Sequence, residues 1–477
     1  MNLAQIMDDH DADSVALISR GRETNYGDLR DQIAHLRGGL ASLGVGRGDR
    51  VALLCGNSRH FVITYFATVG LGAVAVPLNP LSPGPELQAE IATVGAKVVV
   101  IEQLSASTWS NVDRSKVPSV ETVVSTERDG SMPEDALSID GLLAVDPVDV
   151  AEIETDEIAT LIFTSGTAGF PRAAKLTHRN LLAAFDQITD GDNKVCSDDV
   201  IYAVLPLFHI FGLNIVLTIG LHAGATVVLV QRFDAYSAYE SVRDRGVTIL
   251  PGAPAMWAAF TQLEELPADA FSTVRIALSG ASRLPVSVFA AMRERFDIVV
   301  AEGYGLTETS ATVSTSLGQE MKPGSVGRAF QGVEIRLIRD GSDVLVGDVG
   351  EIWVRGVNVF AGYYEDPAAT AAVLTDDGWL KTGDLAMADD DGYMFLVDRA
   401  KDLVIVSGFN VYPAEVEQVL LTHPEVDEVG EDGLIEYALD RLARYKCPSK
   451  IMFVDELPRN ATGKLVRRRL DGDLEVR

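Results

Sequence analysis

Along the first hundred residues, short apolar runs alternate with stretches in which apolar residues recur at helical spacing. The runs are typical of buried strands, and the periodic stretches are typical of amphipathic helices. We expect strands over 51–54, 73–78 and 97–102, with helices that end near residue 43 and cover 61–69 and 86–94. This alternation predicts parallel sheets with right-handed crossovers, and hence an α/β fold.

A polar segment separates this region from a second apolar one. Residues 105–156 are rich in Ser, Asp and Glu, and we expect a surface connection there. Apolar runs then return at 161–163, 200–207, 247–250, 274–278 and 298–301. The last three lead into glycine-containing turns, and open parallel sheets bind ligands outside the carboxyl ends of their strands. From residue 327 onward short strands at 334–338, 350–354 and 393–397 predict a small antiparallel unit.

One of these strands, Leu161–Phe163, ends in a segment of hydroxyls and glycines. Residues 164–169 read Thr-Ser-Gly-Thr-Ala-Gly, and Arg172 and Lys175 follow. Glycines allow close approach of the backbone to an anion, hydroxyls and N–H groups donate to its oxygens, and cations neutralise its charge. The segment therefore predicts a polyphosphate cradle, although its spacing is not that of a Walker A motif. A flexible surface loop is the alternative.

Charge and composition exclude some classes of function. The chain has 477 residues, 40 basic and 69 acidic, and a formal charge of −29, which argues against nucleic acid or an anionic membrane as partner. Its three cysteines lack metal-binding spacing and fit a reducing, cytoplasmic setting. Residues 1–13 show no apolar signal segment. The uncharged stretches 61–85 and 201–230 are broken by Pro and Gly, so we expect core elements and no transmembrane segment.

Six short motifs occur in order over nearly the whole chain. They are Thr164–Lys175, Phe208–Gly212, Glu302–Thr309, Trp379–Asp384, Asp398–Asp402 and Pro458–Lys464. In this order they resemble the adenylate-forming superfamily, and within it the fatty acyl-CoA synthetases most. The resemblance implies a large domain, 1–398, of stacked, mostly parallel sheets, with a β-barrel-like subdomain at 327–398. It also implies a small mobile α+β domain at 399–477.

The resemblance further implies a reaction and its cofactors. Members of the superfamily join a carboxylic acid to ATP as an acyl-adenylate, release pyrophosphate, and usually pass the acyl group to coenzyme A. Because a carboxylate that attacks a phosphate brings two anions together, positioning and charge neutralisation carry the catalysis. The implied partners are a small carboxylic acid, ATP, Mg²⁺ and coenzyme A. A carrier protein is an alternative acyl acceptor.

Three residues are implied to act in adenylation. Lys464 would place its ammonium between the substrate carboxylate and the phosphate, Arg172 would hold phosphate oxygens, and Glu308 would bind Mg²⁺ with a hydroxyl of Thr164 or Thr307. On the residues alone, the alternative for Glu308 is a carboxylate at a helix N-terminus. The alternative for Lys464 is a solvated lysine at the start of a basic run.

Other residues are implied to hold the nucleotide or to form the hinge. Tyr304 would stack on adenine, Asp384 would accept the ribose hydroxyls with help from Arg399, and Lys401 would lie at the pivot between the domains. For Asp384 the alternative is an acid in a turn after glycine. The remaining implied nucleotide contacts are Ser165, Gly166, Thr167, Ala168, Gly169, Gly280, Ala281, Glu302, Gly303 and Gly305.

The acid substrate is expected to be apolar. Peptide-synthetase domains commonly place an aspartate after the Phe of the second motif to hold an amino group, but here His209 follows Phe208. His209 resembles a wall residue of acyl-CoA synthetases, with a core histidine as the alternative. The expected pocket favours a medium or long fatty acid, and an aryl acid fits the same set. That set is Phe208, His209, Leu213, Ala253, Met256, Gly280 and Gly303.

Two departures from the superfamily leave rival functions open. Arg172 and Ala173 replace the usual Lys-Gly of the phosphate loop, which keeps the charge. Residues 430–433 lead directly into the helix expected over 434–442, where the superfamily inserts a sheet of several tens of residues. The rivals are a fatty acyl-AMP ligase that loads a carrier protein, and a non-catalytic acyl- or nucleotide-binding protein.

Overall fold

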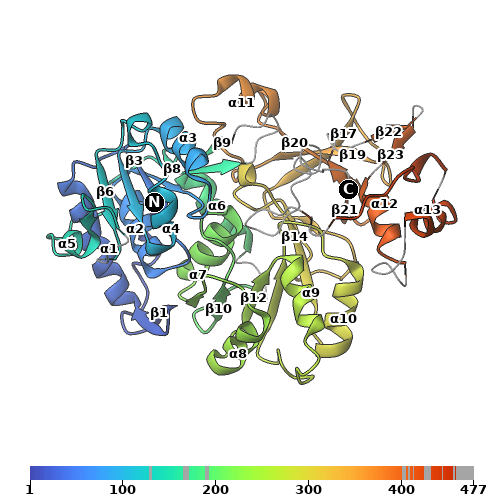
Figure 1. The fold of residues 1–477 in the computed structure, drawn as a ribbon, viewed down its shortest axis with the longest axis horizontal. Coiled ribbons are helices and arrows are strands. Elements are labelled where there is room, and N and C mark those ends of the chain that lie inside the picture. The colour runs from blue at the N-terminus through green and yellow to red at the C-terminus, as the bar shows by residue number, and fades with distance from the viewer. Residues whose placement is uncertain are drawn as a thin grey trace.

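The fold is built on two large sheets that pack against one common core. The computed structural model describes residues 1–127, 132–164, 171–188, 193–399, 404–406, 409–411, 413–423, 431–442, 444–454 and 457. One buried cluster contains side chains from both sheets and from the helices between them, including Leu53, Tyr65, Leu213 and Leu250. The expected α/β fold of mostly parallel sheets is therefore confirmed (Figure 1).

The first sheet has seven strands in the order β7-β6-β5-β3-β4-β8-β9. Its neighbours pair in parallel except β9, which runs antiparallel to β8. The strands are β3 (Arg50–Leu54), β4 (Val74–Pro77), β5 (Val98–Ile101), β6 (Thr122–Ser125), β7 (Leu137–Ser138), β8 (Ile158–Thr164) and β9 (Arg172–Thr177). The crossover helices include α2 (Arg59–Gly70) and α3 (Gly84–Val94), and α1 (Tyr26–Ser42) leads into β3 from the second sheet. All three lie where the apolar periodicity predicts them.

The surface connection expected over 105–156 is wrong. The segment adds β6 and β7 to the edge of the sheet and forms α4 (Gln103–Trp109) and α5 (Ile139–Leu143). Its strands are only four and two residues long, and acidic loops surround them. Strands this short carry little periodic signal, so the polar composition of the loops dominates the sequence pattern.

The second sheet has nine strands in the order β16-β15-β14-β13-β12-β10-β11-β1-β2. Its middle, from β14 to β1, is parallel, and the strands at its two ends are antiparallel. The strands are β1 (Val15–Ser19), β2 (Arg22–Asn25), β10 (Val200–Ala203), β11 (Thr226–Leu229), β12 (Ile249–Gly252), β13 (Ile276–Ser279), β14 (Val300–Tyr304), β15 (Ser314–Thr315) and β16 (Arg328–Ala329). Helices α8 (Ala235–Arg245), α9 (Pro254–Gln262) and α10 (Val286–Phe296) lie beside it at the bottom of Figure 1.

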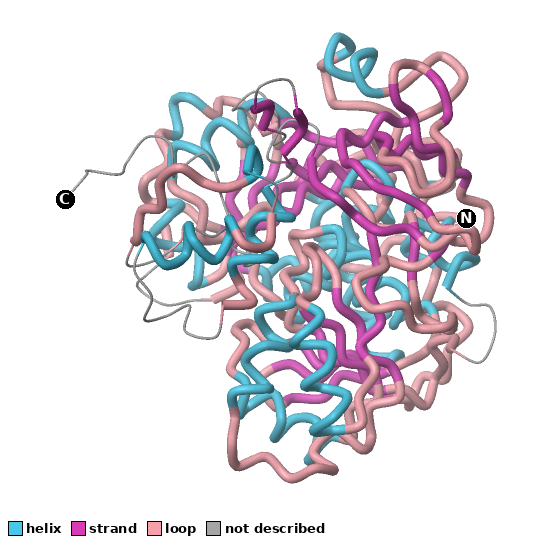
Figure 2. The backbone as a smooth tube through the Cα atoms, turned by 90° about the vertical axis from the view of Figure 1, so that its right-hand side faces the viewer, coloured by secondary structure: helices cyan, strands magenta, loops and turns pink. Residues whose placement is uncertain are grey.

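The helices on the other side of this sheet link it to the first one. They are α6 (His178–Ile188), the π-helix η3 (Phe211–Thr218) and α7 (Ile219–His222). Buried residues of η3 and α7 belong to the common core. Figure 2 shows the strand layers with helices packed alongside them.

A small antiparallel sheet follows, in the order β18-β17-β19-β20-β21. Its strands are β17 (Glu334–Arg339), β18 (Ser342–Asp343), β19 (Gly350–Arg355), β20 (Leu380–Ala388) and β21 (Met394–Arg399). It spans residues 334–399, one residue beyond the expected 327–398 unit, and its two edge strands are β18 and β21. Beyond it, at the right of Figure 1, come the hairpin of β22 (Val404–Val406) and β23 (Phe409–Val411), and helices α12 (Pro413–Leu420) and α13 (Glu431–Leu439).

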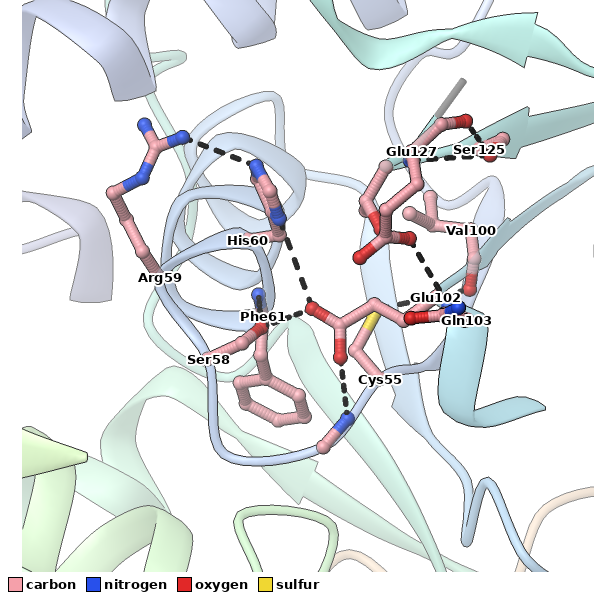
Figure 3. A network of polar contacts seen from close by, with 12 residues as sticks. Cys55, Ser58, Arg59, His60, Phe61, Val100, Glu102, Gln103, Ser125 and Glu127 are labelled. Atoms are coloured by element: carbon pink, nitrogen blue, oxygen red, sulfur yellow. Dashed lines mark hydrogen bonds and ion pairs between the residues drawn. The ribbon is translucent and has the colours of Figure 1, made fainter. Parts of the chain in front are cut away.

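At the carboxyl ends of β3 and β5, a buried polar network fills the space between the strands (Figure 3). The Glu102 carboxylate accepts hydrogen bonds from Gly56 N (3.0 Å) and from the Ser58 hydroxyl, and His60 Nδ1 lies 3.7 Å away. β3 crosses over to β4 on one side and β5 to β6 on the other, so this is a topological switch point. Here side chains occupy the position where such folds commonly bind a ligand.

This network also joins the two sheets. The Asn57 amide donates to the carbonyls of Ala203 (3.0 Å) and Leu205 (2.9 Å), and its oxygen accepts from Leu207 N (3.0 Å). Asn57 is 6% exposed, so the three bonds are sheltered from water. A residue of the first sheet therefore holds the segment that leaves β10 and leads to His209.

No helix among the described residues is long and apolar enough to cross a membrane.

Candidate active site

A cavity of about 1480 Å³ lies at the carboxyl ends of the second sheet. Its lining comes from the β8–β9 region, from η3, from the turns after β13 and β14, and from β20 and β21. Glu417, Leu421 and Thr422, in and just after α12, line it from the opposite side. The cavity thus collects residues from five of the six sequence motifs.

Glycine is required in two of the turns that shape the cavity. A Cβ on Gly280, after β13, would come within 2.7 Å of the Phe211 ring. A Cβ on Gly305, after β14, would come within 2.1 Å of the Ala311 carbonyl oxygen. Between them Ala281 has a positive φ of 69°, a strained conformation for a residue with a side chain. These turns bring backbone close to the cavity, as the sequence predicts for Gly280, Ala281 and Gly305.

One end of the cavity holds the pair expected at the nucleoside. The Tyr304 hydroxyl donates to Asp384 Oδ2 over 2.7 Å, and both residues line the cavity. Asp384 is 6% exposed, and it is paired in register with Arg399 across β20 and β21. The sequence places these residues in three different motifs, and the fold makes them neighbours.

Glu308 lies in η4 (Thr307–Thr309) and also lines the cavity, together with Thr164 and Thr307. Its Oε1 accepts a hydrogen bond of 2.7 Å from the Tyr363 hydroxyl. Burial, reinforced by the adjacent Glu308 carboxylate, raises the pKa of the Tyr363 phenol, so the phenol keeps its proton. A protonated phenol is a hydrogen-bond donor to the carboxylate.

Arg172 begins β9, the strand that pairs with β8. Its Nε donates to Asp366 Oδ2 over 3.1 Å, and its guanidinium lies 5.7 Å from the centre of the Tyr363 ring. Thr164 and Arg172 are register partners across β8 and β9, and the Thr164 hydroxyl contacts the Arg172 carbonyl at 3.4 Å. The carboxylate of Glu308 and the cation of Arg172 therefore flank one aromatic side chain.

The donor set at this end suits Mg²⁺. Among the described residues no group of three or more His, Cys, Asp or Glu side chains could hold a metal by itself. Mg²⁺ is commonly bound through one or two carboxylates together with substrate phosphates. Glu308 with the hydroxyls of Thr164 and Thr307, all in the lining of the cavity, provides such a partial set.

The other end of the cavity is an apolar slot between η3–α7 and the second sheet. Phe211, Ile215, Val216 and Ile219 form the helical wall. The facing wall consists of alternate residues on neighbouring strands, which point to the same face of the sheet. They are Ile201 on β10, Ile249 and Pro251 on β12, and Ile276 and Leu278 on β13. The slot thus extends from the carboxyl ends of the strands to their first residues.

The structure brings together only part of the expected pocket. Phe208, His209, Gly280 and Gly303 line the cavity. Leu213, Ala253 and Met256, which were predicted to line it, pack instead in the buried core and lie outside its lining. Leu213 falls between Phe211 and Ile215 on the helix and turns away from the slot. Ala253 and Met256 begin α9, where the Ala253 N–H points to the Met256 sulfur at 3.5 Å.

Glu302 also differs from its expected role as a nucleotide contact. Its side chain is 5% exposed and accepts a hydrogen bond from Leu284 N over 3.0 Å, outside the cavity lining. Burial raises the pKa of this carboxyl from its ordinary 4.5 to about 7. The carboxylate thus braces the turn after β13. Ser165, Gly166, Thr167, Ala168, Gly169, Lys401 and Lys464 lie outside the described residues.

Sequence reasoning missed Tyr363 and Asp366. Both lie in a segment that precedes α11 (Pro367–Val373), and Asp-Pro is a familiar helix start. That signal explains Asp366 as a cap but gives no reason to place either side chain at a catalytic centre. Only the pairing of this segment with β9 does so.

A family model described as "AMP-binding enzyme" matches residues 5–364. The chain belongs to this family. It is 32% identical to 4-coumarate–CoA ligase 5 of Oryza sativa subsp. japonica, over 95% of this chain and 90% of the relative. That alignment runs over 494 positions, more than the 477 residues here, so the relative carries residues without a counterpart in this chain.

Two solved structures share the fold closely. The anthranilate CoA ligase AuaEII in complex with anthranoyl-AMP has a TM-score of 0.91 at 26% identity, covering 99% of this chain and 96% of that one. ATP-bound MatB from Rhodopseudomonas palustris has a TM-score of 0.90 at 28% identity, covering 98% of each chain. The expected adenylate-forming superfamily is confirmed. Relatives named here as ligases are ligases of aryl acids, so the specific likeness to fatty acyl-CoA synthetases is not supported.

Proposed function

We propose that this AMP-binding enzyme is an ATP-dependent carboxylic acid–CoA ligase that acts on an acid with an extended apolar tail. The acid would be joined to AMP with release of pyrophosphate, and the acyl group would then pass to coenzyme A. The observation that carries the proposal is one cavity with a polar end at Glu308, Arg172 and Asp384 and an aliphatic slot at the other. The named ligases among its relatives, and the anthranoyl-AMP and ATP complexes, support it.

Each polar group has a task that its position allows. Asp384 would accept the ribose hydroxyls beside Tyr304, and the Arg172 guanidinium would bind phosphate oxygens. Glu308, with Thr164 or Thr307, would hold Mg²⁺, which supplies charge neutralisation on the phosphates when bound. Lys464 would bring a second cation to the attacking carboxylate, and Lys401 would lie at the hinge of a mobile domain 399–477. The substrate acid and ATP are both anions, and the protein itself has a formal charge of −29. These cations would therefore lower the barrier to adenylate formation by offsetting the repulsion between negative charges.

The slot favours a medium- or long-chain fatty acid. Apart from the Phe211 ring, its walls are aliphatic and proline side chains, and they run along the strands, whose rise of about 3.3 Å per residue suits an extended alkyl chain. An aryl-substituted acid is the second candidate, because the names of the relatives point to one and because the Phe211 ring forms the wall beside Gly280. The described cations that line the cavity, Arg172, Arg283 and Lys381, come from β9, the turn after β13 and β20, and the residues of the two slot walls include none.

One assay decides among the alternatives. Purified protein is given ATP, Mg²⁺ and a panel of hexanoate, dodecanoate, palmitate, benzoate and 4-coumarate, with and without coenzyme A. Pyrophosphate release and thioester formation with the alkyl acids support the proposal, and preference for the aryl acids selects the second candidate. Adenylate without thioester indicates an acyl-AMP ligase for a carrier protein, and ATP binding without pyrophosphate release indicates a binding protein.

A variant of Lys464 provides the internal check. Lys464→Ala should lower adenylate formation by about 10²–10³, because it removes a cation that is needed at the transition state. Thioester formation from acyl-AMP supplied ready-made should remain. Equal loss of both steps would contradict this role.

A further inference from the structure

The segment Phe360–Asp366 is bound to both halves of the polar end of the cavity. It pairs with β9 through one isolated antiparallel bridge, with hydrogen bonds from Ala361 N to the Lys175 carbonyl (3.0 Å) and from Tyr364 N to the Ala173 carbonyl (2.8 Å). At its start, Phe360 N donates to the Glu308 carbonyl over 2.9 Å. One segment of the backbone therefore fixes β9 and η4 relative to each other.

Two side chains of this segment also contact the side chains of Glu308 and Arg172. The Tyr363 hydroxyl donates to Glu308 Oε1, and Asp366 Oδ2 accepts from Arg172 Nε. Asp366 is itself held, because its Oδ1 accepts from Ala369 N over 2.8 Å at the start of α11. Tyr363 is held through its backbone N–H, which donates to the Thr370 hydroxyl over 2.9 Å.

The contact with Asp366 orients Arg172 and leaves most of its N–H donors available to a ligand. A guanidinium has five N–H donors, and the contact engages Nε, so the two terminal nitrogens still offer four donors to an anion. The guanidinium also lies near the Tyr363 ring. Two contacts therefore fix the orientation of the Arg172 side chain. Its conformational entropy is lost on folding, so binding of a ligand does not have to bear that cost.

Resting on the proposed function, we propose that Tyr363 and Asp366 are positioning residues for adenylation. Tyr363 sets the carboxylate of Glu308 for the metal ion that accompanies ATP, and Asp366 sets the guanidinium of Arg172 for the phosphate oxygens. Neither residue belongs to the six motifs, and neither needs to touch the reacting atoms. Both act through the residue that each one holds.

The two roles predict different responses to Mg²⁺. Tyr363→Phe removes a single hydroxyl, so it should raise the Mg²⁺ concentration for half-maximal pyrophosphate release about tenfold. Calorimetry should show a similar loss of ATP affinity when Mg²⁺ is present and none in its absence. Asp366→Asn keeps the acceptor for Ala369 N, and should weaken ATP binding about fivefold with or without Mg²⁺.

The chain offers a matched control for each change. Tyr364→Phe removes the neighbouring hydroxyl, for which the described residues show no hydrogen bond, and should leave every value unchanged. Asp234→Asn alters another helix cap, which accepts from Ser237 N over 2.8 Å on α8. Both controls should unfold at the same urea concentration as the wild type, within error.

The outcomes separate this inference from the proposed function. If Tyr363→Phe matches Tyr364→Phe in the Mg²⁺ titration and in calorimetry, or loses ATP affinity equally without Mg²⁺, the role of Tyr363 is overturned. If Asp366→Asn matches Asp234→Asn, the role of Asp366 is overturned. A wild type that binds Mg²⁺ with ATP but releases no pyrophosphate with any acid ends the proposed function, while the binding measurements still decide the inference. A wild type that binds no ATP ends both.

Discussion

Parallel strands of both large sheets end in glycine-containing turns. The turns of the second sheet border a cavity, and those of the first enclose a buried polar network. At β13 and β14 of the second sheet, glycine turns leave a cavity beside Gly280 and Gly303. At β3 and β5 of the first, the turn Gly56–Ser58 is closed by the buried Glu102 carboxylate (Figure 3). Parallel sheets make a crevice at such ends, but residue choice decides whether it holds a ligand or a structural network. Four predictions test this contrast.

The largest effect is expected from closing the end that contains the cavity. A Cβ on Gly303 would have only the Ser314 carbonyl oxygen near it, at 3.6 Å, so the backbone accepts a side chain there. Gly303→Leu should lower pyrophosphate release about 10³-fold by blocking the acid, with an unchanged urea midpoint. Gly141→Leu is the control, since a Cβ at Gly141 meets nothing within 4 Å and lies far from the cavity lining. A Gly303→Leu enzyme with normal kcat and KM would contradict the position of the pocket.

Removing the buried carboxylate at the end of the first sheet is expected to lower stability and to leave activity almost unchanged. Glu102→Ala leaves two buried donors, Gly56 N and the Ser58 hydroxyl, without their acceptor. We expect a loss of about 3 kcal/mol in the free energy of unfolding, with kcat within twofold of the wild type. Urea titration measures the free energy of unfolding, and the pyrophosphate assay measures kcat. A large fall in kcat with unchanged stability would show that this end is functional and not structural.

An intermediate effect is expected at the residue that joins the two ends. Asn57→Ala removes three hydrogen bonds to the segment before Phe208 and His209. We expect a loss of about 2 kcal/mol in stability, and a KM for the acid raised severalfold while the KM for ATP stays constant. Asn111→Ala, which removes an exposed bond to the Ser107 carbonyl, is the control. Equal changes in both KM values would argue against a specific link to the acid.

The smallest change from one condition to the next, about 1.4 kcal/mol for each pH unit, is expected at the brace behind the turn after β13. The pKa of Glu302 is raised to about 7, so the folded protein keeps this proton after the unfolded chain has lost it. The stability that Glu302 contributes is complete below about pH 4.5 and is lost as the pH rises through 7. Glu302→Gln should remove this component, which is about 1.4 kcal/mol for each unit of pKa difference. Urea midpoints at pH 5, 6, 7 and 8 that fall in parallel for both proteins would refute it.

Local pattern was enough for the strands and turns that position the site. The strand–glycine order at Gly280 and Gly303 predicted where the second sheet ends. The choice of Tyr304, Glu308 and Asp384 as one group came from the resemblance to the superfamily. Local pattern failed where position depends on partners distant in the chain. Tyr363 is 55 residues from Glu308, and Asp366 is 194 from Arg172. No periodicity in either segment marks these pairs.

The acyl pocket shows a second limit. The helical segment expected to line the slot does so, but Leu213 was predicted as its lining residue and Phe211 and Ile215 line the cavity instead. Which side of a helix faces a cavity depends on its exact register and on its hydrogen-bond type. Here the segment is a π-helix, and a 3.6-residue period does not describe it.

Because of that π-helix, a change of one residue in chain length could alter the lining of the acid pocket. Its hydrogen bonds span five residues, as from Ile219 N to the Asn214 carbonyl, so it carries one residue more per turn than its neighbours need. Deleting one residue between Phe211 and Thr218 would restore α-helical register and rotate everything beyond by about 100°. A new set of side chains would then meet the sheet, and residues 223–225 before β11 would have to absorb the rotation. Descendants of this protein could exchange one acid for another through a single codon lost or gained.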